Sequence, residues 1–319
     1  MPLQSDLFGV PAKPRGPASC LLRQPEQVND TSADLPLKEF ARFKMESGNS
    51  IVLFHGDCFI GMESLLTEDS VDVVITSPPY NIGVRYGNYD DKVPRKSYLE
   101  WMHNWGILVK RVLKPNGSLF LNIGSKPSDP WIPFDVAGEL RHTFVLQNVF
   151  HWIKSIYVEN TSYDDHTSLA VGHFKPINSK RFVNDAHEYV FHFTHTGKVE
   201  IDRLAIGVPY KDGSNIARWK SSKSGIRCRG NNWYIPYQTI QKRSSDRPHP
   251  ATFPPELAEM CIKLHGLKGV NVVLDPFLGI GNSALACARL GKEMIGFDVD
   301  EEYLSIAARI LEKFDAATD

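Results

Sequence analysis

Four consecutive residues of the chain form a candidate acceptor site. The apolar or β-branched run 73–76 passes directly into Ser77-Pro78-Pro79-Tyr80. The Ser77 hydroxyl and the Pro78 carbonyl can each accept a hydrogen bond, and the double proline fixes φ, so both acceptors keep one orientation. Tyr80 offers a flat face to an aromatic ring. Two fixed acceptors beside a flat ring can hold a planar group that donates hydrogen bonds.

A tight turn is the alternative explanation of the same four residues. Ser-Pro and Pro-Pro steps are common in turns. The position favours a site, because residues 71–77 are typical of a buried central strand, and open α/β sheets bind ligands beyond the carboxyl ends of such strands.

A glycine loop near the C-terminus is the second candidate. The segment VVLDPFLGIGNSALA (272–286) predicts a strand, a loop with Gly279 and Gly281, and a helix that begins near Ser283. Glycines let the backbone approach a ligand, and a helix N-terminus offers unpaired N–H groups to a carboxylate or phosphate. A dinucleotide-binding loop is the alternative, since Ala284 fits its third small position, although the Asp-Pro-Phe start is not its usual form.

A carboxylate at the end of the following strand identifies the ligand class more closely. Asp298 in GFDVD lies where a carboxylate can accept hydrogen bonds from two vicinal ribose hydroxyls. A strand-end or capping role without a ligand is the alternative for Asp298 and for Asp57 of the segment HGD. Combined with the glycine loop, these carboxylates favour a nucleoside ligand.

Positive charge gathers in two segments although the net charge is −1. Residues 211–247 contain nine Lys or Arg against two Asp, and Arg85 lies in a basic loop soon after Tyr80. This balance suits a polyanion, and a solvated basic face is the alternative. The candidate phosphate- or base-contacting residues are Arg85, Lys220, Lys223, Arg227, Arg229 and Arg243.

Strands and helices alternate along the chain. Apolar runs predict strands at 51–57, 71–77 and 118–124, with a helix at 97–113 between the last two, and further strands at 144–156 and 187–196. After an irregular stretch, a helix at 254–266 and two strand-loop-helix units follow. This order predicts an α/β fold with a mostly parallel sheet flanked by helices.

Composition limits the remaining classes. Of the 319 residues, 42% are hydrophobic and 23% charged, as in ordinary soluble proteins, and no apolar run approaches the roughly 20 residues of a membrane span. The N-terminus has no signal-peptide core. Five widely spaced cysteines without a Cys-x-x-Cys pair predict reduced thiols and no metal site.

Three segments together resemble a known enzyme family. DPFLGIGNS, GFDVD and TSPPY are similar to the motifs of the DNA amino-methyltransferases, which move a methyl group from S-adenosylmethionine to an exocyclic base nitrogen. The order of the motifs is similar to the β class of that family, and the resemblance covers residues 50–312. It implies a Rossmann-like class I methyltransferase fold with circularly permuted motif order, S-adenosylmethionine as cofactor and no metal.

The resemblance also implies roles for individual residues. Ser77, Pro78, Pro79 and Tyr80 would hold a base flipped out of the duplex, with stacking on Tyr80 offsetting part of a cost of roughly a few kcal/mol. The cofactor would contact Asp57, Asp275, Pro276, Phe277, Gly279, Gly281, Asn282, Ser283, Asp298 and Val299, with His249 of RPHPATFPPEL at its methionine end. Members often have two threonines where this chain has Asn282 and Ser283, and both of these can still form hydrogen bonds.

The implied organisation has four parts. Residues 1–48 are expected to be a flexible leader, 49–196 the catalytic half, 197–247 a target-recognition insertion and 248–314 the cofactor-binding half. The expected partners are double-stranded DNA and a cognate restriction endonuclease, for a monomer or homodimer without a membrane, located in the cytoplasm at the nucleoid.

Several functions remain open. In the family, Ser at the first motif position usually accompanies N4-cytosine methylation and Asp or Asn accompanies N6-adenine methylation, so cytosine is favoured and adenine is the alternative. Methylation of a protein glutamine amide fits less well, because there the cofactor loop precedes the acceptor motif. A nicotinamide-dependent oxidoreductase and a non-catalytic DNA-binding module are the alternatives from other classes.

Overall fold

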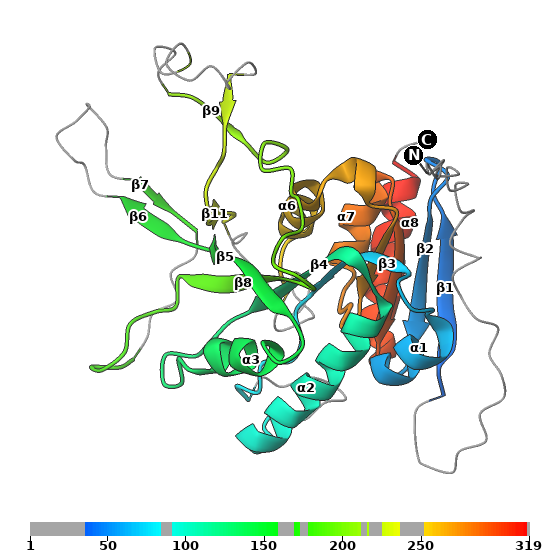
Figure 1. Ribbon diagram of the computed structural model, residues 1–319, viewed down its shortest axis with the longest axis horizontal. Helices are drawn as coiled ribbons and strands as arrows, with labels where there is room; N and C mark the ends of the chain where they lie inside the picture. The colour runs from blue at the N-terminus through cyan, green and yellow to red at the C-terminus, as the bar shows by residue number, and fades with distance from the viewer. Residues whose placement is uncertain are drawn as a thin grey trace, which may run out of the picture.

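The computed structural model describes residues 36–83, 91–158, 169–172, 178–211, 216, 225–236 and 252–317. A mixed sheet of nine strands forms its centre (Figure 1), in the order β1-β2-β13-β12-β3-β4-β8-β5-β11. The five strands in the middle are mutually parallel: β2 (Ser50–His55), β13 (Glu293–Asp298), β12 (Val272–Asp275), β3 (Val71–Thr76) and β4 (Leu113–Ile123). The last two strands of the chain therefore lie between its early strands β2 and β3.

The edges of the sheet depart from the parallel pattern. On one side, β1 (Lys38–Lys44) pairs antiparallel with β2. On the other, β8 (His187–Thr194) pairs antiparallel with both β4 and β5 (Val145–Ile153). The strand β11 (Asn232–Tyr234) then adds in parallel to β5. The predicted α/β class with a mostly parallel central sheet is thus confirmed.

Helices cover both faces of the sheet because the central strands are apolar on both sides. Ile51 and Leu53 of β2 belong to one core, and Val52 and Phe54, which alternate with them, belong to the other. The first core is shared with α6 (Pro255–His265), α7 (Asn282–Leu290) and α8 (Glu301–Asp315), and a short 3₁₀ turn, η2 (Leu267–Gly269), follows α6. The second is shared with α1 (Cys58–Leu65), α2 (Arg95–Val112) and α3 (Ile132–Leu140).

Residues 38–44 differ from the expected flexible leader, because they form β1. Phe40, Ala41 and Phe43 pack against the core, and the register with β2 runs from Lys38 opposite His55 to Lys44 opposite Ser50. The sequence KEFARFK places its phenylalanines among charged residues, which conceals an edge strand in a polar stretch. The leader boundary at 48 is therefore too late.

The expected insertion at 197–247 is partly integral to the sheet. Trp233 of β11 is fully buried, and its ring stacks on Phe150 of β5 with centroids 4.2 Å apart. The short pairs β6 (Ile156–Val158) with β7 (Leu169–Val171), and β9 (Val208–Pro209) with β10 (Ile226–Arg227), form separate two-stranded sheets. In Figure 1, β6, β7 and β9 extend away from the helices that cover the main sheet.

Candidate active site

One cavity lies at the carboxyl ends of the central strands. Its wall includes residues that follow β2, β3 and β12, the end of β13 and a side chain of α2. Because these strands are parallel, their carboxyl ends meet at the same edge of the sheet. Both sequence candidates therefore face one space, which is lined among others by Asp57, Ser77, Pro79, Phe277, Asp298 and Trp101.

The strand-end carboxylate Asp298 organises the glycine loop. Its Oδ2 accepts a 2.7 Å hydrogen bond from the Gly279 N–H, and its Oδ1 accepts one of 2.9 Å from the Asp300 N–H. Burial raises the pKa of Asp298 to about 6, although these two backbone hydrogen bonds oppose the shift. Gly279 has a positive φ of 55°, a conformation that glycine adopts at little cost. The loop thus curves toward Asp298, beside the cavity.

Asp275 has a different position from the one expected of a ligand residue, because its carboxylate points into the protein. Only 1% exposed, it accepts hydrogen bonds from the hydroxyls of Thr76 (2.6 Å) and Ser283 (2.5 Å) and from the Phe277 N–H (3.1 Å). Burial raises its pKa to about 6 against these three bonds. Asp275 and the buried Ser283 are absent from the cavity wall and hold the loop from behind.

The other residues of the glycine loop also divide into those that line the cavity and those that do not. Pro276, Phe277, Gly279 and Asn282 contribute to the cavity wall, as does Val299 after β13. Gly281 does not, and its role is steric. Its φ is 82°, and a Cβ there would meet Ala307 Cβ at 2.6 Å.

Asn282 connects the loop to the segment that carries His249. Its side-chain amide donates a 2.7 Å hydrogen bond to the Phe253 carbonyl, and Thr252 and Phe253 line the cavity. His249 itself lies outside the described residues, so its role stays a prediction.

Asp57 caps α1 and also reaches the cavity. Its Oδ1 accepts a 2.6 Å hydrogen bond from the Phe59 N–H, the arrangement of an N-cap. The predicted capping alternative and the predicted site position therefore coincide in this residue. Near it, the Trp101 ring lies 5.8 Å from Phe59 and 5.5 Å from Phe277, measured between centroids. Trp101 and Phe277 line the cavity and give one side of it an apolar surface, with Phe59 packed against Trp101.

The acceptor motif continues into a polar network. Ser77 lines the cavity, and its Oγ lies 2.6 Å from the Tyr80 hydroxyl oxygen. Tyr80 is only 5% exposed, is not part of the cavity wall and donates a 3.0 Å hydrogen bond to Glu188 Oε2. Pro79 lines the cavity, while its carbonyl accepts a 2.8 Å bond from the Tyr98 hydroxyl, and Pro78 is buried.

Glu188 of β8 is the acidic group at the centre of this network. Its Oε1 forms an ion pair with Lys154 at 2.9 Å, and its Oε2 accepts a 2.7 Å bond from the Asn122 amide. Burial would raise the pKa of Glu188, but the Lys154 charge and the hydrogen bonds from Lys154, Asn122 and Tyr80 outweigh it and hold that pKa below its ordinary value. The carboxylate is therefore ionised near neutral pH.

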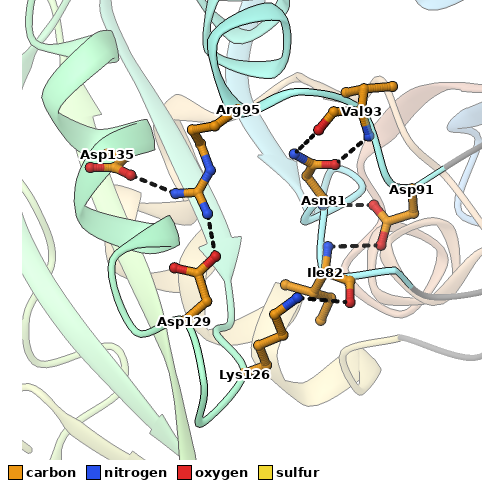
Figure 2. Close-up of polar contacts among 8 residues, drawn as sticks. All are labelled: Asn81, Ile82, Asp91, Val93, Arg95, Lys126, Asp129 and Asp135. Atoms are coloured by element: carbon orange, nitrogen blue, oxygen red, sulfur yellow. Dashed lines mark hydrogen bonds and ion pairs between the residues drawn. The ribbon is translucent and has the colours of Figure 1, made fainter.

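Hydrogen bonds join the residues directly after the acceptor motif to residues 91 and 93 (Figure 2). Asp91, 2% exposed, accepts the Asn81 N–H at 2.6 Å and the Ile82 N–H at 3.1 Å, and its own carbonyl accepts the Gly83 N–H at 2.8 Å. The Asn81 side chain also donates to the Val93 carbonyl at 2.9 Å and accepts the Val93 N–H at 2.8 Å. We call these residues, Asn81, Ile82, Gly83, Asp91 and Val93, the loop clamp.

Arg95, which follows the loop clamp, has its charge paired within the protein. Arg95 forms ion pairs with Asp129 and Asp135, the latter at 2.5 Å (Figure 2). The candidate Arg85 itself lies outside the described residues.

Two of the predicted DNA-contacting residues are described. Arg227 in β10 is exposed, and its Nη1 donates a long 3.4 Å bond to the neighbouring Cys228 carbonyl. Arg229 is half-buried and its Nε donates a 2.9 Å bond to the Ile206 carbonyl. Lys220, Lys223 and Arg243 lie outside the described residues. Neither of the two described arginines lines the cavity.

Sequence reasoning missed three residues at this site. Trp101 lies in α2 between the buried residues Tyr98 and Met102, and a large aromatic residue off the buried face of a helix is the signal that could have found it. Asn122 and Glu188 are polar residues inside the apolar strands β4 and β8. A polar residue in a strand buried on both faces needs a partner, which marks it for attention.

The fold and the cavity define an α/β protein with a cavity at the carboxyl edge of its sheet, where such folds bind ligands. The chain belongs to the DNA methylase family that groups N6- and N4-methylases, whose model matches residues 71–309. Members of this family transfer methyl groups from S-adenosylmethionine, so the predicted family and cofactor are confirmed.

Relatives of the chain include type II methyltransferases and an adenine methyltransferase. The chain is 27% identical over 248 residues to Type II methyltransferase M.HpaI from Haemophilus parainfluenzae (77% of this chain, 70% of the relative). It is 28% identical over 293 residues to M.BglII from Bacillus subtilis (89% and 74%). It is 25% identical over 268 residues to DNA adenine methyltransferase YhdJ from Escherichia coli (strain K12), with 82% of each chain covered.

Among solved structures, the fold is similar to a PvuII DNA methyltransferase (cytosine-N4-specific). The TM-score is 0.58 at 21% identity, over 81% of this chain and 85% of that chain. This likeness confirms the predicted class I methyltransferase fold.

Within the described residues, no helix is long and apolar enough to cross a bilayer, and no group of three or more His, Cys, Asp or Glu side chains is placed to hold a metal ion.

Proposed function

We propose that this protein is a site-specific DNA methyltransferase that transfers a methyl group from S-adenosylmethionine to the N4 amine of a flipped-out cytosine. One observation carries the proposal: Ser77, after β3, and Asp298, at the end of β13, line the same cavity. The first residue suits an amino group and the second a ribose. A cavity that joins them can hold the methyl donor and the acceptor together, which is the main requirement of a direct transfer.

The residues of the cavity fit the cofactor. The Asp298 carboxylate can accept the ribose hydroxyls on the lone pairs that remain beside its two backbone bonds. Val299 and the rings of Trp101 and Phe277 supply apolar surface for the adenine and the methionine chain. When bound, the sulfonium supplies an already activated methyl group. Asp275 and Ser283 support the loop in this proposal and do not contact the cofactor directly.

The target amine would bind to the acceptor motif. Its lone pair is delocalised into the ring, so the site must hold both amino hydrogens to direct that lone pair toward the methyl group. We assign the Ser77 hydroxyl and the Pro78 carbonyl to these hydrogens. Tyr80 is proposed to hold Ser77 through its hydroxyl. Its ring is 5% exposed and outside the cavity wall, so the expected stacking on the base is not part of this proposal.

N6-adenine methylation is the second candidate, and a specific observation supports it. The chain is similar to YhdJ, which is named an adenine methyltransferase, and adenine presents the same amino group to the same neutral acceptors. The Ser at position 77 favours cytosine. The kinship to type II methyltransferases supports a cognate restriction endonuclease as a partner, with double-stranded DNA as substrate.

The base is determined by methylating a random DNA library with isotopically labelled S-adenosylmethionine and separating the digested nucleosides. We expect label in N4-methylcytosine at one sequence context. Label only in N6-methyladenine would reject the cytosine assignment, and no label in DNA would reject the methyltransferase proposal.

The acceptor site is tested with Ser77→Ala, which should lose turnover while S-adenosylmethionine binding, measured by calorimetry, is retained. Ser64→Ala is the matched control, because the Ser64 hydroxyl bonds the Ile60 carbonyl within α1. Its turnover should equal that of the wild type.

A further inference from the structure

The hydrogen bonds behind Ser77 lead from the cavity to the carboxylate of Glu188, whose side chain is 13% exposed. Ser77 Oγ lies 2.6 Å from the Tyr80 hydroxyl oxygen, and this hydroxyl donates to Glu188 Oε2 at 3.0 Å. The Asn122 amide donates to the same two partners, at 2.8 Å to Tyr80 and 2.7 Å to Glu188. The network therefore joins three strand ends and the acceptor motif.

The charge of Glu188 determines the direction of each bond in this chain. An ionised carboxylate can only accept, so the Tyr80 hydroxyl hydrogen points at Glu188. With its hydrogen used there, the Tyr80 oxygen acts as an acceptor toward Ser77. The Ser77 hydroxyl is then the donor of their 2.6 Å contact. The Asn122 amide donates a long 3.4 Å bond to Ser77 Oγ, which leaves the second lone pair of Ser77 for the cavity.

The ion pair with Lys154 makes this arrangement stable. A largely buried carboxylate without a counter-charge would take up a proton, and a protonated Glu188 could donate to Tyr80 and reverse the chain. Lys154 Nζ lies 2.9 Å from Glu188 Oε1, on the oxygen that Tyr80 does not use. Lys154 is itself 19% exposed, so the pair is shielded from water on most sides.

We propose that Glu188 is a positioning residue that acts through Tyr80 to present the Ser77 hydroxyl to the target base as a hydrogen-bond acceptor. The inference rests on the proposed function and deepens it. Without the carboxylate, the Ser77 hydrogen is free to point into the cavity, where it would oppose an amino hydrogen. Substrate and cofactor could still bind, but the amine would lose one of its two acceptors in the transition state.

The first test compares kcat, the DNA KM and S-adenosylmethionine affinity for Tyr80→Phe and Glu188→Gln. Both variants should lower kcat about 10- to 100-fold, the effect expected of one charge-assisted hydrogen bond, with little change in cofactor affinity or KM. Tyr189→Phe is the control, since Tyr189 is the next residue of β8 and points to the opposite face. It should keep the wild-type kcat.

The second test asks whether Glu188 acts through Tyr80. In the Tyr80→Phe background, Glu188→Gln should cause little further loss of kcat, because the relay is already broken. The inference would be refuted if the two losses of kcat multiplied in the double variant, or if either single variant kept a normal kcat. If Glu188→Gln does not fold, Lys154→Met replaces it, because without the ion pair Glu188 can take up a proton and reverse the chain; its loss of kcat should likewise disappear in the Tyr80→Phe background. Absence of methyl transfer by the wild type would instead refute the proposed function.

Discussion

Thr76 and Asp275 are joined by a 2.6 Å hydrogen bond between the ends of the neighbouring strands β3 and β12. Thr76 immediately precedes Ser77, and Asp275 immediately precedes the glycine loop. Both residues are buried, at 0% and 1% exposure. The bond therefore fixes the acceptor motif and the proposed cofactor loop relative to each other.

Thr76→Val should show how much this bond stabilises the fold. Valine has nearly the same shape but cannot donate, so the Asp275 carboxylate would lose one of three hydrogen bonds in a buried position. We expect the free energy of unfolding in urea to fall by about 1–3 kcal/mol. Ser305→Ala in α8 is the control, with a change of about 0.5 kcal/mol or less. Equal stability of Thr76→Val and wild type would contradict the assignment.

Gly281→Ala and Gly138→Ala should have opposite effects on stability. At Gly281, φ is 82° and the added Cβ would meet Ala307 Cβ at 2.6 Å, so the free energy of unfolding should fall by about 1–3 kcal/mol. Gly138 lies within α3 with nothing within 4 Å of an added Cβ. There alanine should stabilise the helix by about 0.5–1 kcal/mol. Thermal unfolding of both variants tests this prediction, and a lower stability of both variants than of the wild type would contradict it.

S-adenosylmethionine affinity should decrease at acidic pH through Asp298. Only the ionised carboxylate accepts both ribose hydroxyls, and with a pKa of about 6 its ionised fraction falls to about a tenth at pH 5. Calorimetry should show roughly tenfold weaker binding at pH 5 than at pH 7. Asp298→Asn should bind weakly at both values. A pH dependence that persists in Asp298→Asn would assign the effect to another group, such as Asp275, whose pKa is also about 6.

A loss of stability caused by protonation of Asp298 cannot explain this loss of affinity. The pKa of about 6 in the folded protein exceeds the ordinary value of 3.8, so the folded state takes up this proton first. Its contribution to stability is complete below 3.8 and is lost as the pH rises through about 6. Acidification from pH 7 to 5 therefore favours the folded state through this residue, while it weakens the binding of S-adenosylmethionine.

Arg227→Ala should weaken DNA binding and its dependence on salt. The side chain is exposed in β10, and a single phosphate contact adds about one unit to the slope of log K against log salt. We expect the slope, measured by fluorescence anisotropy, to fall by about one. Arg309→Ala removes the same charge from the exposed face of α8 and should leave the slope unchanged. An unchanged slope in Arg227→Ala would remove this residue from the proposed DNA surface.

The sequence predicted the central elements because their patterns are local. Residues 71–77 form a short apolar run, and the structure contains β3 at Val71–Thr76. The helix predicted at 97–113 is α2 at Arg95–Val112. In each case the apolar spacing alone determines the element. The edge strand β1 was missed because a strand with one neighbour, here β2, needs little apolar surface.

The candidate site was predictable where one segment carries the chemistry and unpredictable where distant segments meet. Asp298 and the glycine loop are recognisable from residue types and spacing. The orientation of Asp275 away from the cavity depends on Thr76, which is far away in the chain. The pairing of Glu188 with Lys154 and Tyr80 likewise joins separate strands, so no local pattern could have indicated it.

The loop clamp has a consequence for engineering. Asp91 and Val93 form hydrogen bonds with Asn81, Ile82 and Gly83, so the described residues before and after positions 84–90 are held together. The closure entropy of a loop rises by only about 0.6 kcal/mol for each doubling of its length. A change in the number of residues between Gly83 and Asp91 should therefore be tolerated, while the hydrogen bonds of Ser77 and Tyr80 are kept.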